Sequence, residues 1–514
     1  MRRLNRFARG FQPAGILAVK GRVKPTNTRR AWSSVVVVLT LATVCVAPIG
    51  PIARAAGRFA AAGLPAGTRL MVLAPHEDDE TLATGQLIAA ARRQGHPIRV
   101  VFITGGDGFT RAAAAESGDR RPTVDDYLAL ATERRKEAAR ATAALGLRPE
   151  DVVFLGYPDR GLKEMLLGHW SAADPYRSAF TDSTRSPYPD ILRPGAPHAG
   201  EALLADLEQV IAGFRPTLIA APHTGDVHPD HWATAVFAGL AVARLQAAGK
   251  LPGASPSILG YVVHAGPWPS PPWSAPDLPL SPPQALAGAG VTWIVRRAAP
   301  AERAQKELAI ASYRTQLRVS RDYLTSFART NELLGAGRTV TAAQVDQAPA
   351  TEADWRALPV AVTNPWSGAA LGRRAASPDW SQARLAWDGR SLHVRLELTS
   401  RPNRPADYRF YVYLPASLVR LEVRLRTEGG PASATLTDLD RGPSRPLPAG
   451  SGPDGRSVWA SLDLSSPPFP FYVGLEGPEG TPEAEPASWS LVNAPRTVSS
   501  SSFSCSANPG PRRE

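Results

Sequence analysis

The 514-residue sequence contains only two cysteines, and neither is placed for chemistry. Cys45 lies in an apolar segment near the N-terminus that is typical of an export signal, and Cys505 lies in a serine-rich, low-complexity ending. Once such a signal is removed, a single cysteine remains. The scarcity therefore excludes a disulfide within one mature chain and a catalytic apparatus built on cysteine.

Negative charge is absent from residues 1–55, and this absence explains most of the formal net charge of +12. The segment carries ten Lys or Arg residues and no Asp or Glu, which leaves a net charge of +2 for the rest of the chain. A nearly balanced remainder lacks the basic excess that nucleic-acid binding requires. The sequence therefore predicts no nucleic-acid partner.

The basic residues precede the apolar run Val35–Ala47, and Ala53–Ala55 follows as a small-residue cleavage site. This layout predicts that residues 1–55 are an export signal and that the mature protein is extracellular or in the cell envelope. Thr28–Trp32 loosely resembles a twin-arginine signal, which would imply export in the folded state. An uncleaved anchor is the alternative, although the run is shorter than the roughly 20 residues of a spanning helix. Membrane contact is expected only in that case.

Short apolar runs alternate with helical patterns from about residue 69 to residue 340, and residues 66–345 are interpreted as one domain. The expected strands are Leu70–Leu73, Ile98–Ile103, Val152–Leu155, Leu218–Ala221 and Ile258–Val263. The expected helices are Glu80–Arg93, Asp125–Leu145, Gly200–Phe214 and Trp232–Leu245. This alternation predicts an α/β fold with a Rossmann-like, mostly parallel sheet and helices on both faces.

Two clusters of histidines and carboxylates follow expected strands. The first is His76–Glu80, and the second is His228–His231. Because ligands of open α/β sheets bind at the carboxyl ends of the strands, the two loops are expected to meet over one crevice. Acidic residues also favour helix N-termini, which is the structural alternative for Asp79 and Glu80. Two such clusters together favour a site.

The two clusters resemble the signature of the PIG-L/LmbE-type deacetylases, metal-dependent hydrolases that remove acetyl from N-acetylglucosaminyl groups. The family's first motif, His-Pro-Asp-Asp-Glu, stands here as His76–Glu80 with Glu77 in the proline position. Its second motif, His-Pro-Asp-His, is intact at His228–His231. Supporting fragments are Thr104–Gly108, Arg134–Glu137, Phe154–Asp159, Lys306 and Tyr313–Gln316. The resemblance covers roughly residues 69 to 330.

The resemblance implies a role for each matching residue. His76, Asp79 and His231 would bind one Zn2+ ion per chain, with Fe2+ as the alternative metal. Asp78 would be the general base, and His228 would stabilise the transition state. The substrate would be an N-acetylated amino sugar in a glycan, glycolipid or envelope polymer. Apart from the resemblance, the residue type makes Arg134 a candidate to bind a sugar hydroxyl or phosphate, and it reads equally well as part of a solvated helix face.

The residue chemistry agrees with this assignment. A catalytic zinc takes three N or O ligands and keeps a position for water. Attack on an amide carbonyl creates an oxyanion, which the metal and a protonated His228 could stabilise. Asp230 is expected to orient a histidine rather than to bind the metal. His264 is interpreted as a structural histidine, and Asp107 as a turn residue between glycines.

After about residue 350 the pattern changes to short alternating runs with a turn at Asp388–Gly389, which predicts a β-sandwich domain over residues 350–497. Six of the twelve tryptophans lie there: Trp355, Trp366, Trp380, Trp387, Trp459 and Trp489. They could stack on sugar rings, but most are interpreted as core residues. Residues 498–514 are expected to be a disordered tail.

Two long segments rich in proline interrupt the first domain, at residues 171–199 and 267–283. Each is either a wall of the substrate site or disordered, and the first is the better candidate for a wall. The predicted function is thus an exported zinc-dependent N-deacetylase. The alternatives are a metal hydrolase of another amide or ester, and an inactive carbohydrate-binding envelope protein. The sequence is silent on oligomeric state.

Overall fold

The computed structural model describes residues 64–251, 255–287, 291–336, 339–367, 379–415, 417–428, 430–440, 442–464, 471–477 and 488–493. All of them belong to one compact unit, Gly50–Glu514. The predicted export signal and the predicted tail lie outside the described residues. Within the described part of the chain, no helix combines the length and the apolar character needed to cross a membrane.

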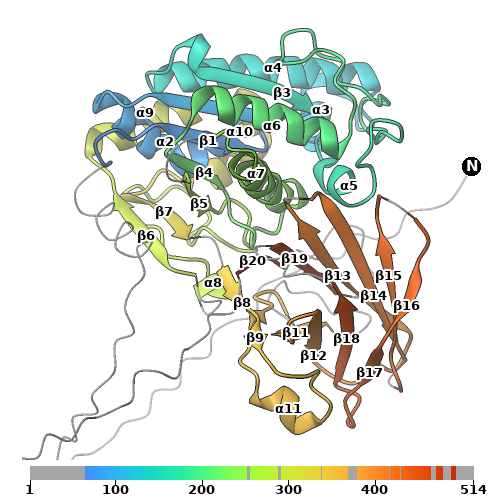
Figure 1. Cartoon of the computed structure of the whole chain (residues 1–514). Helices are drawn as coiled ribbons and strands as arrows, with labels where there is room; N and C mark the ends of the chain where they lie inside the picture. Colours follow the sequence, from blue (N-terminus) through green and yellow to red (C-terminus); the bar gives the residue numbers. More distant parts are fainter. Residues whose placement is uncertain are drawn as a thin grey trace, which may run out of the picture. The chain divides into compact units, whose positions relative to one another are not determined.

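The first domain has an α/β fold, and its sheet has the strand order β3-β2-β1-β4-β5-β7-β6 (Figure 1). Its strands are β1 (Leu70–Ala74), β2 (Ile98–Thr104), β3 (Val152–Tyr157), β4 (Leu218–Pro222), β5 (Ser257–Tyr261), β6 (Trp293–Arg297) and β7 (Asn331–Ala336). The first five run parallel, whereas β7 pairs antiparallel with both β5 and β6. The five expected strands are confirmed, and the antiparallel edge is an addition to the prediction.

Helices cover this sheet. They are α2 (Asp79–Arg93), α3 (Thr110–Ser117), α4 (Val124–Ala144), α5 (Leu162–Leu167), α6 (Gly200–Phe214), α7 (Pro229–Ala247), α8 (Gln284–Ala287), α9 (Pro300–Ile310) and α10 (Arg314–Thr325), with a short 3-10 turn at Pro149–Asp151. Each expected helix is present within a few residues of its predicted bounds. The segment 171–199 forms neither helix nor named strand and holds one isolated bridge, between Arg185 and Pro197.

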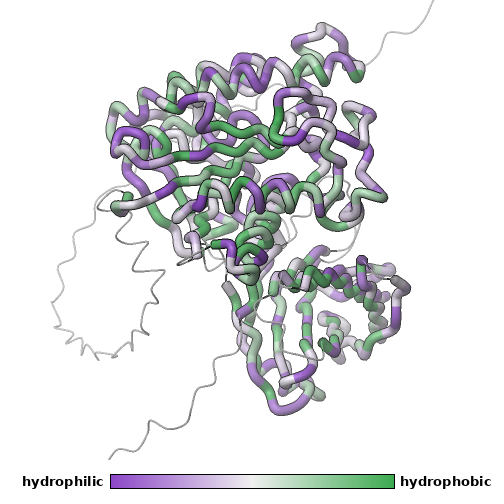
Figure 2. Tube along the Cα trace, turned by 45° about the horizontal axis from the view of Figure 1, so that its top comes forward, coloured by the Kyte–Doolittle hydropathy of each residue, from purple (hydrophilic) through white to green (hydrophobic). Residues whose placement is uncertain are grey.

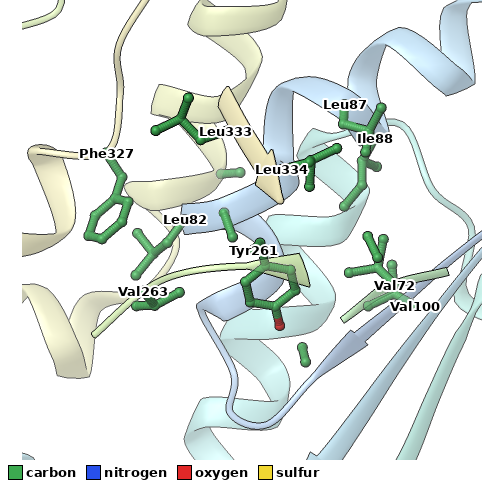
Figure 3. Packing of buried hydrophobic residues seen from close by; sticks show 14 of the residues in the cluster. Val72, Leu82, Leu87, Ile88, Val100, Tyr261, Val263, Phe327, Leu333 and Leu334 are labelled. Carbon is green, nitrogen blue, oxygen red and sulfur yellow. The ribbon is translucent and has the colours of Figure 1, made fainter. Parts of the chain in front are cut away.

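Alternate residues of β1 enter two different hydrophobic clusters, so both faces of the sheet are buried. Leu70 and Val72 belong to one cluster, and Met71 and Leu73 belong to the other. Hydrophobic residues accordingly follow one another along the central strands in Figure 2. Figure 3 shows the first cluster, in which Tyr261 lies among aliphatic side chains; its hydroxyl donates to the carbonyl of Leu73 at 2.7 Å. Full burial of each large aliphatic side chain contributes about 1.5–3 kcal/mol.

The C-terminal region consists of two further sheets, with the strand orders β10-β11-β12-β18-β17 and β16-β15-β14-β13-β19-β20-β8, and β9 pairs with β11. The strands are β8 (Thr339–Thr341), β9 (Ala343–Gln344), β10 (Val362–Thr363), β11 (Trp380–Trp387), β12 (Ser391–Leu398), β13 (Ala406–Leu414), β14 (Val419–Thr427), β15 (Ser433–Asp438), β16 (Arg445–Leu447), β17 (Ala449–Ser451), β18 (Ser457–Asp463), β19 (Phe471–Glu476) and β20 (Ser488–Asn493). A short helix, α11 (Glu352–Ala357), precedes β10. The predicted hairpin at Asp388–Gly389 joins β11 to β12. A third hydrophobic cluster takes residues from both sheets, such as Leu385 and Phe410.

Most of the C-terminal tryptophans are buried, as expected. Trp355, Trp366, Trp380, Trp387 and Trp489 are each at most 4% exposed, and Trp459 is partly buried. Three of the buried ones do not belong to the core between the C-terminal sheets, and Trp355 lies in a small separate cluster with Leu358 and Ala386. Trp366 belongs to one α/β cluster and Trp489, with Tyr411 and Tyr413, to the other. The C-terminal region therefore has its own core and also contributes residues to both hydrophobic clusters of the α/β sheet.

Candidate metal centre

The two histidine loops meet because they follow neighbouring strands. β1 and β4 are parallel and paired, with Leu70 opposite Leu218, so their carboxyl ends lie at the same edge of the sheet. The loop after β1 carries His76, and α7 begins after β4 and carries His231 in its first turn. The ring centroids of His76 and His231 lie 5.3 Å apart.

A carboxylate oxygen of Asp79 lies between these two imidazoles. Oδ2 of Asp79 is 3.2 Å from Nδ1 of His76 and 3.1 Å from Nε2 of His231. Ligand atoms of a tetrahedral zinc ion with bonds of 2.0–2.2 Å are separated by about 3.3 Å. Nε2 of His231 is also buried without a hydrogen bond of acceptable geometry. Asp79 is therefore spaced for a shared small cation with either histidine, although His76, Asp79 and His231 are not themselves one of the sets whose ligand atoms all lie within 4.8 Å of one another.

Asp226 orients His231 from the side away from Asp79. Its Oδ2 is 3.2 Å from Nδ1 of His231 and accepts hydrogen bonds of 2.9 Å from the backbone N–H groups of Val263 and His264. A carboxylate behind a metal-binding histidine fixes the ring and its tautomer. Burial opposes protonation of His231, but the charges of Asp226 and Asp79 raise its pKa to about 10. That electrostatic environment attracts a cation.

His228 caps the N-terminus of α7. Its Nδ1 accepts a hydrogen bond of 3.3 Å from the backbone N–H of Asp230, and its ring centroid is 4.8 Å from that of His76. Burial and the charges of the neighbouring histidines hold the pKa of His228 well below its usual range. Since Nδ1 accepts, the neutral ring carries its proton on Nε2. His228 is therefore placed to act as a neutral donor, and the protonated imidazole expected from the sequence stays a prediction.

The carboxylate of Asp78 takes no part in capping the helix that follows it. The residue precedes α2 with a φ of 149°, in a region that side-chain-bearing residues rarely adopt, yet its side chain makes no capping hydrogen bond. Its side chain is 15% exposed, and Oδ2 is 3.8 Å from Nη2 of Arg134. Burial, and then the charge of Asp79, raise the pKa of Asp78 well above its usual range. Backbone strain at a partly exposed carboxylate is a common feature of functional sites.

Arg134 is buried, with 3% of its surface exposed, and its guanidinium donates hydrogen bonds to the backbone. Its Nη1 donates to the carbonyl of Gly106 and its Nη2 to the carbonyl of Glu77, both at 2.9 Å. Nε of Arg134 lies 3.7 Å from the carboxylate of Glu77, which is buried without a hydrogen-bond partner. The prediction of a solvated helix face is wrong for Arg134. Its substrate contact stays a prediction.

Three further residues join the site, and the sequence did not single them out as ligands. Oδ1 of Asp159 and Oδ2 of Asp230 lie 3.3 Å and 3.2 Å from Nε2 of His76. The ring of His264 lies 4.7 Å from that of His231. In the described residues, three groups have ligand atoms within 4.8 Å of one another: His76, His228 and His231; His76, Asp159, His228 and Asp230; and Asp79, His231 and His264. Asp159 follows β3 and His264 follows β5, so their position after a strand was the available signal.

Asp230 is held as a partner of His76. Besides His76, its carboxylate accepts hydrogen bonds from the backbone N–H groups of Arg160 at 2.6 Å and Leu162 at 3.0 Å. With both oxygens occupied in this way, Asp230 orients the histidine, in agreement with its expected role. His264, by contrast, is not a remote structural histidine, since it contacts the rings of both His228 and His231.

Comparison with known proteins agrees with this arrangement. Residues 71–242 match the family model described as PIG-L, GlcNAc-PI de-N-acetylase. The chain is 32% identical over 167 residues to a 1D-myo-inositol 2-acetamido-2-deoxy-alpha-D-glucopyranoside deacetylase of Nocardia farcinica, covering 32% of this chain and 47% of that protein. A protein of the same name from a Mycobacterium species is 32% identical over 180 residues, covering 35% of this chain and 51% of that protein. The chain thus spans about half the length of these relatives.

Among solved structures, a conserved protein from Thermus thermophilus shares 24% identity and covers 49% of this chain and 82% of its own, with a TM-score of 0.29. The N,N'-diacetylchitobiose deacetylase of Pyrococcus horikoshii shares 16% identity over 54% of this chain and 85% of its own, with a TM-score of 0.31. Together with the paired motifs at the ends of β1 and β4, the family match shows that this chain carries a domain of the PIG-L family over residues 71–242.

Proposed function

We propose that the protein is a metal-dependent N-deacetylase that removes acetyl from N-acetylglucosamine-type amino sugars. The observation that carries this proposal is the Asp79 carboxylate between His76 and His231, with the partly exposed carboxylate of Asp78 next to it in the chain. The names of the relatives, which are deacetylases of a glucosaminyl inositol, support the reaction and the class of substrate.

The chemistry follows from the donor set. A zinc ion held by His76, Asp79 and His231 would lower the pKa of water and polarise the amide carbonyl. Asp78 would accept a proton from the attacking water, and its raised pKa suits a general base near neutral pH. His228 would donate its Nε2 hydrogen to the oxyanion, and the same hydrogen bond would weaken once the carbonyl re-forms.

We propose zinc as the resident metal, with one ion per chain and iron(II) as the alternative, because histidine and carboxylate ligands accept both. The segment 171–199 contributes to the substrate wall, since its Tyr188 hydroxyl donates to Asp107 at 2.6 Å and Asp107 in turn accepts from the backbone of Asp159. Asp107 therefore links a long segment to the site. The proposed substrate is an amino sugar in a glycan, glycolipid or envelope polymer, and the proposed location is the cell envelope or the exterior.

We also interpret the α/β sheet as Rossmann-like, on its strand order, and the two C-terminal sheets as a β-sandwich, on their shared core. The alternative of an inactive carbohydrate-binding protein finds less support, because most C-terminal tryptophans are buried and offer no stacking platform. A hydrolase of another amide or ester is the second enzymatic alternative. It would use the same donors with a different acyl group.

The decisive experiment is release of free amine from a panel of N-acetylglucosamine glycosides and oligomers. The zinc-loaded protein is compared with its Asp78→Asn variant, which keeps the shape but cannot accept the proton. We expect release by the wild type and a loss of about 10²- to 10⁴-fold in the variant. Absence of release from a folded, zinc-bound wild type would leave another acyl substrate or a binding role.

A further inference from the structure

The loop between β4 and α7 receives a hydrogen bond from the C-terminal region. The indole Nε1–H of Trp366 donates to the carbonyl oxygen of Gly225 at 3.0 Å. The same peptide unit is held at its other end, because the N–H of Asp226 donates to the carbonyl of His223 at 2.9 Å. A peptide plane fixed at both ends cannot rotate without the loss of a buried hydrogen bond.

The peptide that Trp366 holds leads directly to Asp226. The carboxylate of Asp226 lies 3.2 Å from Nδ1 of His231 and also accepts from the backbone of His228 at 2.9 Å. The direction of the Asp226 side chain, and with it the orientation of the His231 ring, therefore depends on the Gly225–Asp226 peptide. A Cβ at Gly225 would lie 2.7 Å from Cδ2 of Leu286, so this leucine packs closely against the glycine.

Trp366 is anchored from the C-terminal side. It follows β10, and its backbone N–H donates to the side chain of Asn364 at 3.0 Å. Asn364 in turn donates to the carbonyl of Trp380 at 3.0 Å and to the carboxylate of Asp379 at 3.1 Å. The ring of Trp366 is nevertheless buried in the α/β cluster with Leu286. Trp366 thus connects the six-stranded C-terminal sheet to the loop between β4 and α7, which we call the metal loop.

A second contact acts on the helix that carries His231. Trp232, the next residue of α7, stacks on Trp489 of β20 with ring centroids 6.2 Å apart. Further along α7, a Cβ at Gly239 would lie 1.9 Å from the hydroxyl of Tyr472 in β19, so the helix and the strand are in close contact. The C-terminal sheets therefore hold α7 near the metal loop and along its length.

We infer that the C-terminal region is part of the metal centre's framework, with Trp366 as a positioning residue that sets the Gly225–Asp226 peptide and through it His231. This inference rests on the metal site of the proposed function. The relation between the C-terminal region and the deacetylase domain is then not that of a tethered sugar-binding module. Removal of the indole N–H of Trp366 therefore loosens the orientation of His231, although Trp366 does not itself bind the metal.

The test measures zinc affinity of the full chain by competition with a chromogenic chelator. Trp366→Phe removes the donor and keeps most of the aromatic volume. Trp387→Phe is the matched control, because that ring is equally buried but belongs to the core between the C-terminal sheets. Outer partners of metal ligands typically contribute 10- to 100-fold to affinity, so we expect about a 10-fold loss for Trp366→Phe alone. Urea unfolding of the zinc-free proteins separates this loss from a general loss of stability.

Equal zinc affinity of the two variants would overturn the inference alone, and a wild type that binds no zinc would overturn it together with the zinc site of the proposed function. A loss confined to Trp366→Phe supports it, whether or not the protein releases amine from any acetylated sugar. Failure of the proposed deacetylation and failure of the inference are therefore separate results, since the zinc competition needs no substrate. The Trp366→Ser variant offers a further check, since it should bind zinc no better than Trp366→Phe.

Discussion

Oδ2 of Asp79 lies 3.1 Å from Nε2 of His231, although the two residues belong to loops after different strands. The contact joins a carboxylate whose pKa is lowered and a histidine whose pKa is raised. A divalent cation held here would displace the proton from Nε2 of His231. The contact therefore marks the place where metal and proton compete.

This competition predicts the effect of metal removal. Treatment with a chelator should abolish amine release and lower the melting temperature, and added zinc should restore both. A ligand at 1,000 times its Kd stabilises a fold by about 4 kcal/mol, which is a measurable shift. Activity assays and differential scanning calorimetry of the same samples check both effects.

His231→Ala should bind zinc too weakly for that stabilisation to appear. His169→Ala is the control, since His169 is a partly exposed histidine in another loop. A His231→Ala protein that retains tight zinc binding would show that the ligand set is different.

Substitution of His228 separates two ways of stabilising an oxyanion. His228→Gln keeps an N–H donor, whereas His228→Ala keeps none. Because burial and neighbouring histidines hold the pKa of His228 low, a neutral donor is expected to suffice. We expect kcat to fall by about 10²-fold in the alanine variant, with an unchanged KM and a smaller loss in the glutamine variant.

Steady-state kinetics between pH 6 and pH 8 provide the check. The ratio of wild-type to His228→Ala activity should stay constant over that range, since His228 does not titrate there. A ratio that follows a single ionisation near pH 7 would instead show that the protonated imidazole is the active form.

Arg134→Lys tests whether Arg134 holds the loop after β1 or contacts the substrate. A lysine keeps the charge but cannot donate to the carbonyls of both Gly106 and Glu77 with one planar group. If Arg134 holds the loop, the variant should lose about 1–3 kcal/mol of stability, and kcat should fall at an unchanged KM. Urea unfolding and initial rates measure these quantities.

Arg140→Lys on the same helix is the control, because Arg140 is 44% exposed and pairs only with Glu133 in the described residues. An unchanged stability of Arg134→Lys together with a raised KM would assign Arg134 to the substrate instead.

The sequence predicted the part of the site that follows directly from the order of the strands. Because β1 and β4 were recognisable as buried runs, the two histidine motifs could be placed at one edge of a parallel sheet before any contact was known. His264 and Asp159 were not selected, since a single polar residue after a strand has an equally good structural explanation. Only the three-dimensional arrangement brings His264 against His231.

The long-range contacts of the C-terminal region could not be predicted from the sequence, for a different reason. The alternating pattern identified β11 to β14, but it could not tell which core each tryptophan enters. Trp366 reads as one of six tryptophans in a β-rich region, and its membership of the α/β cluster depends on packing between distant segments. The spacing of hydrophobic residues indicates that a side chain is buried, but it does not indicate which segment the side chain packs against.

Tyr188→Phe tests whether the segment 171–199 is fixed to the site. The variant loses the hydroxyl that donates to Asp107 at 2.6 Å. Burial, and then the charge of Asp159, raise the pKa of Asp107 to about 7, so the carboxyl is mostly ionised only above that pH. A charged acceptor without its donor costs about 1–3 kcal/mol, and the loss of stability should therefore be larger at pH 8.5 than at pH 5.5.

Urea unfolding at the two pH values measures this difference. Tyr127→Phe is the control, since its hydroxyl makes an exposed contact of 3.3 Å to Thr110. Equal losses at both pH values would mean that Asp107 is neutral throughout, and no loss at either would mean that the segment is held by other contacts.

His198 should make the stability of the protein depend on pH. The residue is 1% exposed within the same segment, and burial lowers its pKa from 6.5 to about 4. Between those values the unfolded chain binds a proton that the folded protein does not, so the free energy of unfolding falls as the pH falls from about 7 to about 4. One proton corresponds to a slope of up to about 1.4 kcal/mol per pH unit.

His198→Asn should remove this slope, and its urea midpoints at pH 7.5 and pH 5.0 should differ less than those of the wild type. His96→Asn, in the turn between α2 and β2, serves as the control and should keep the wild-type difference. If His198→Asn and the wild type lose the same stability between the two pH values, His198 is protonated in the folded protein. The burial of its ring would then be compensated by an acceptor, and the acid sensitivity would have to come from the carboxylates around His76 and His231.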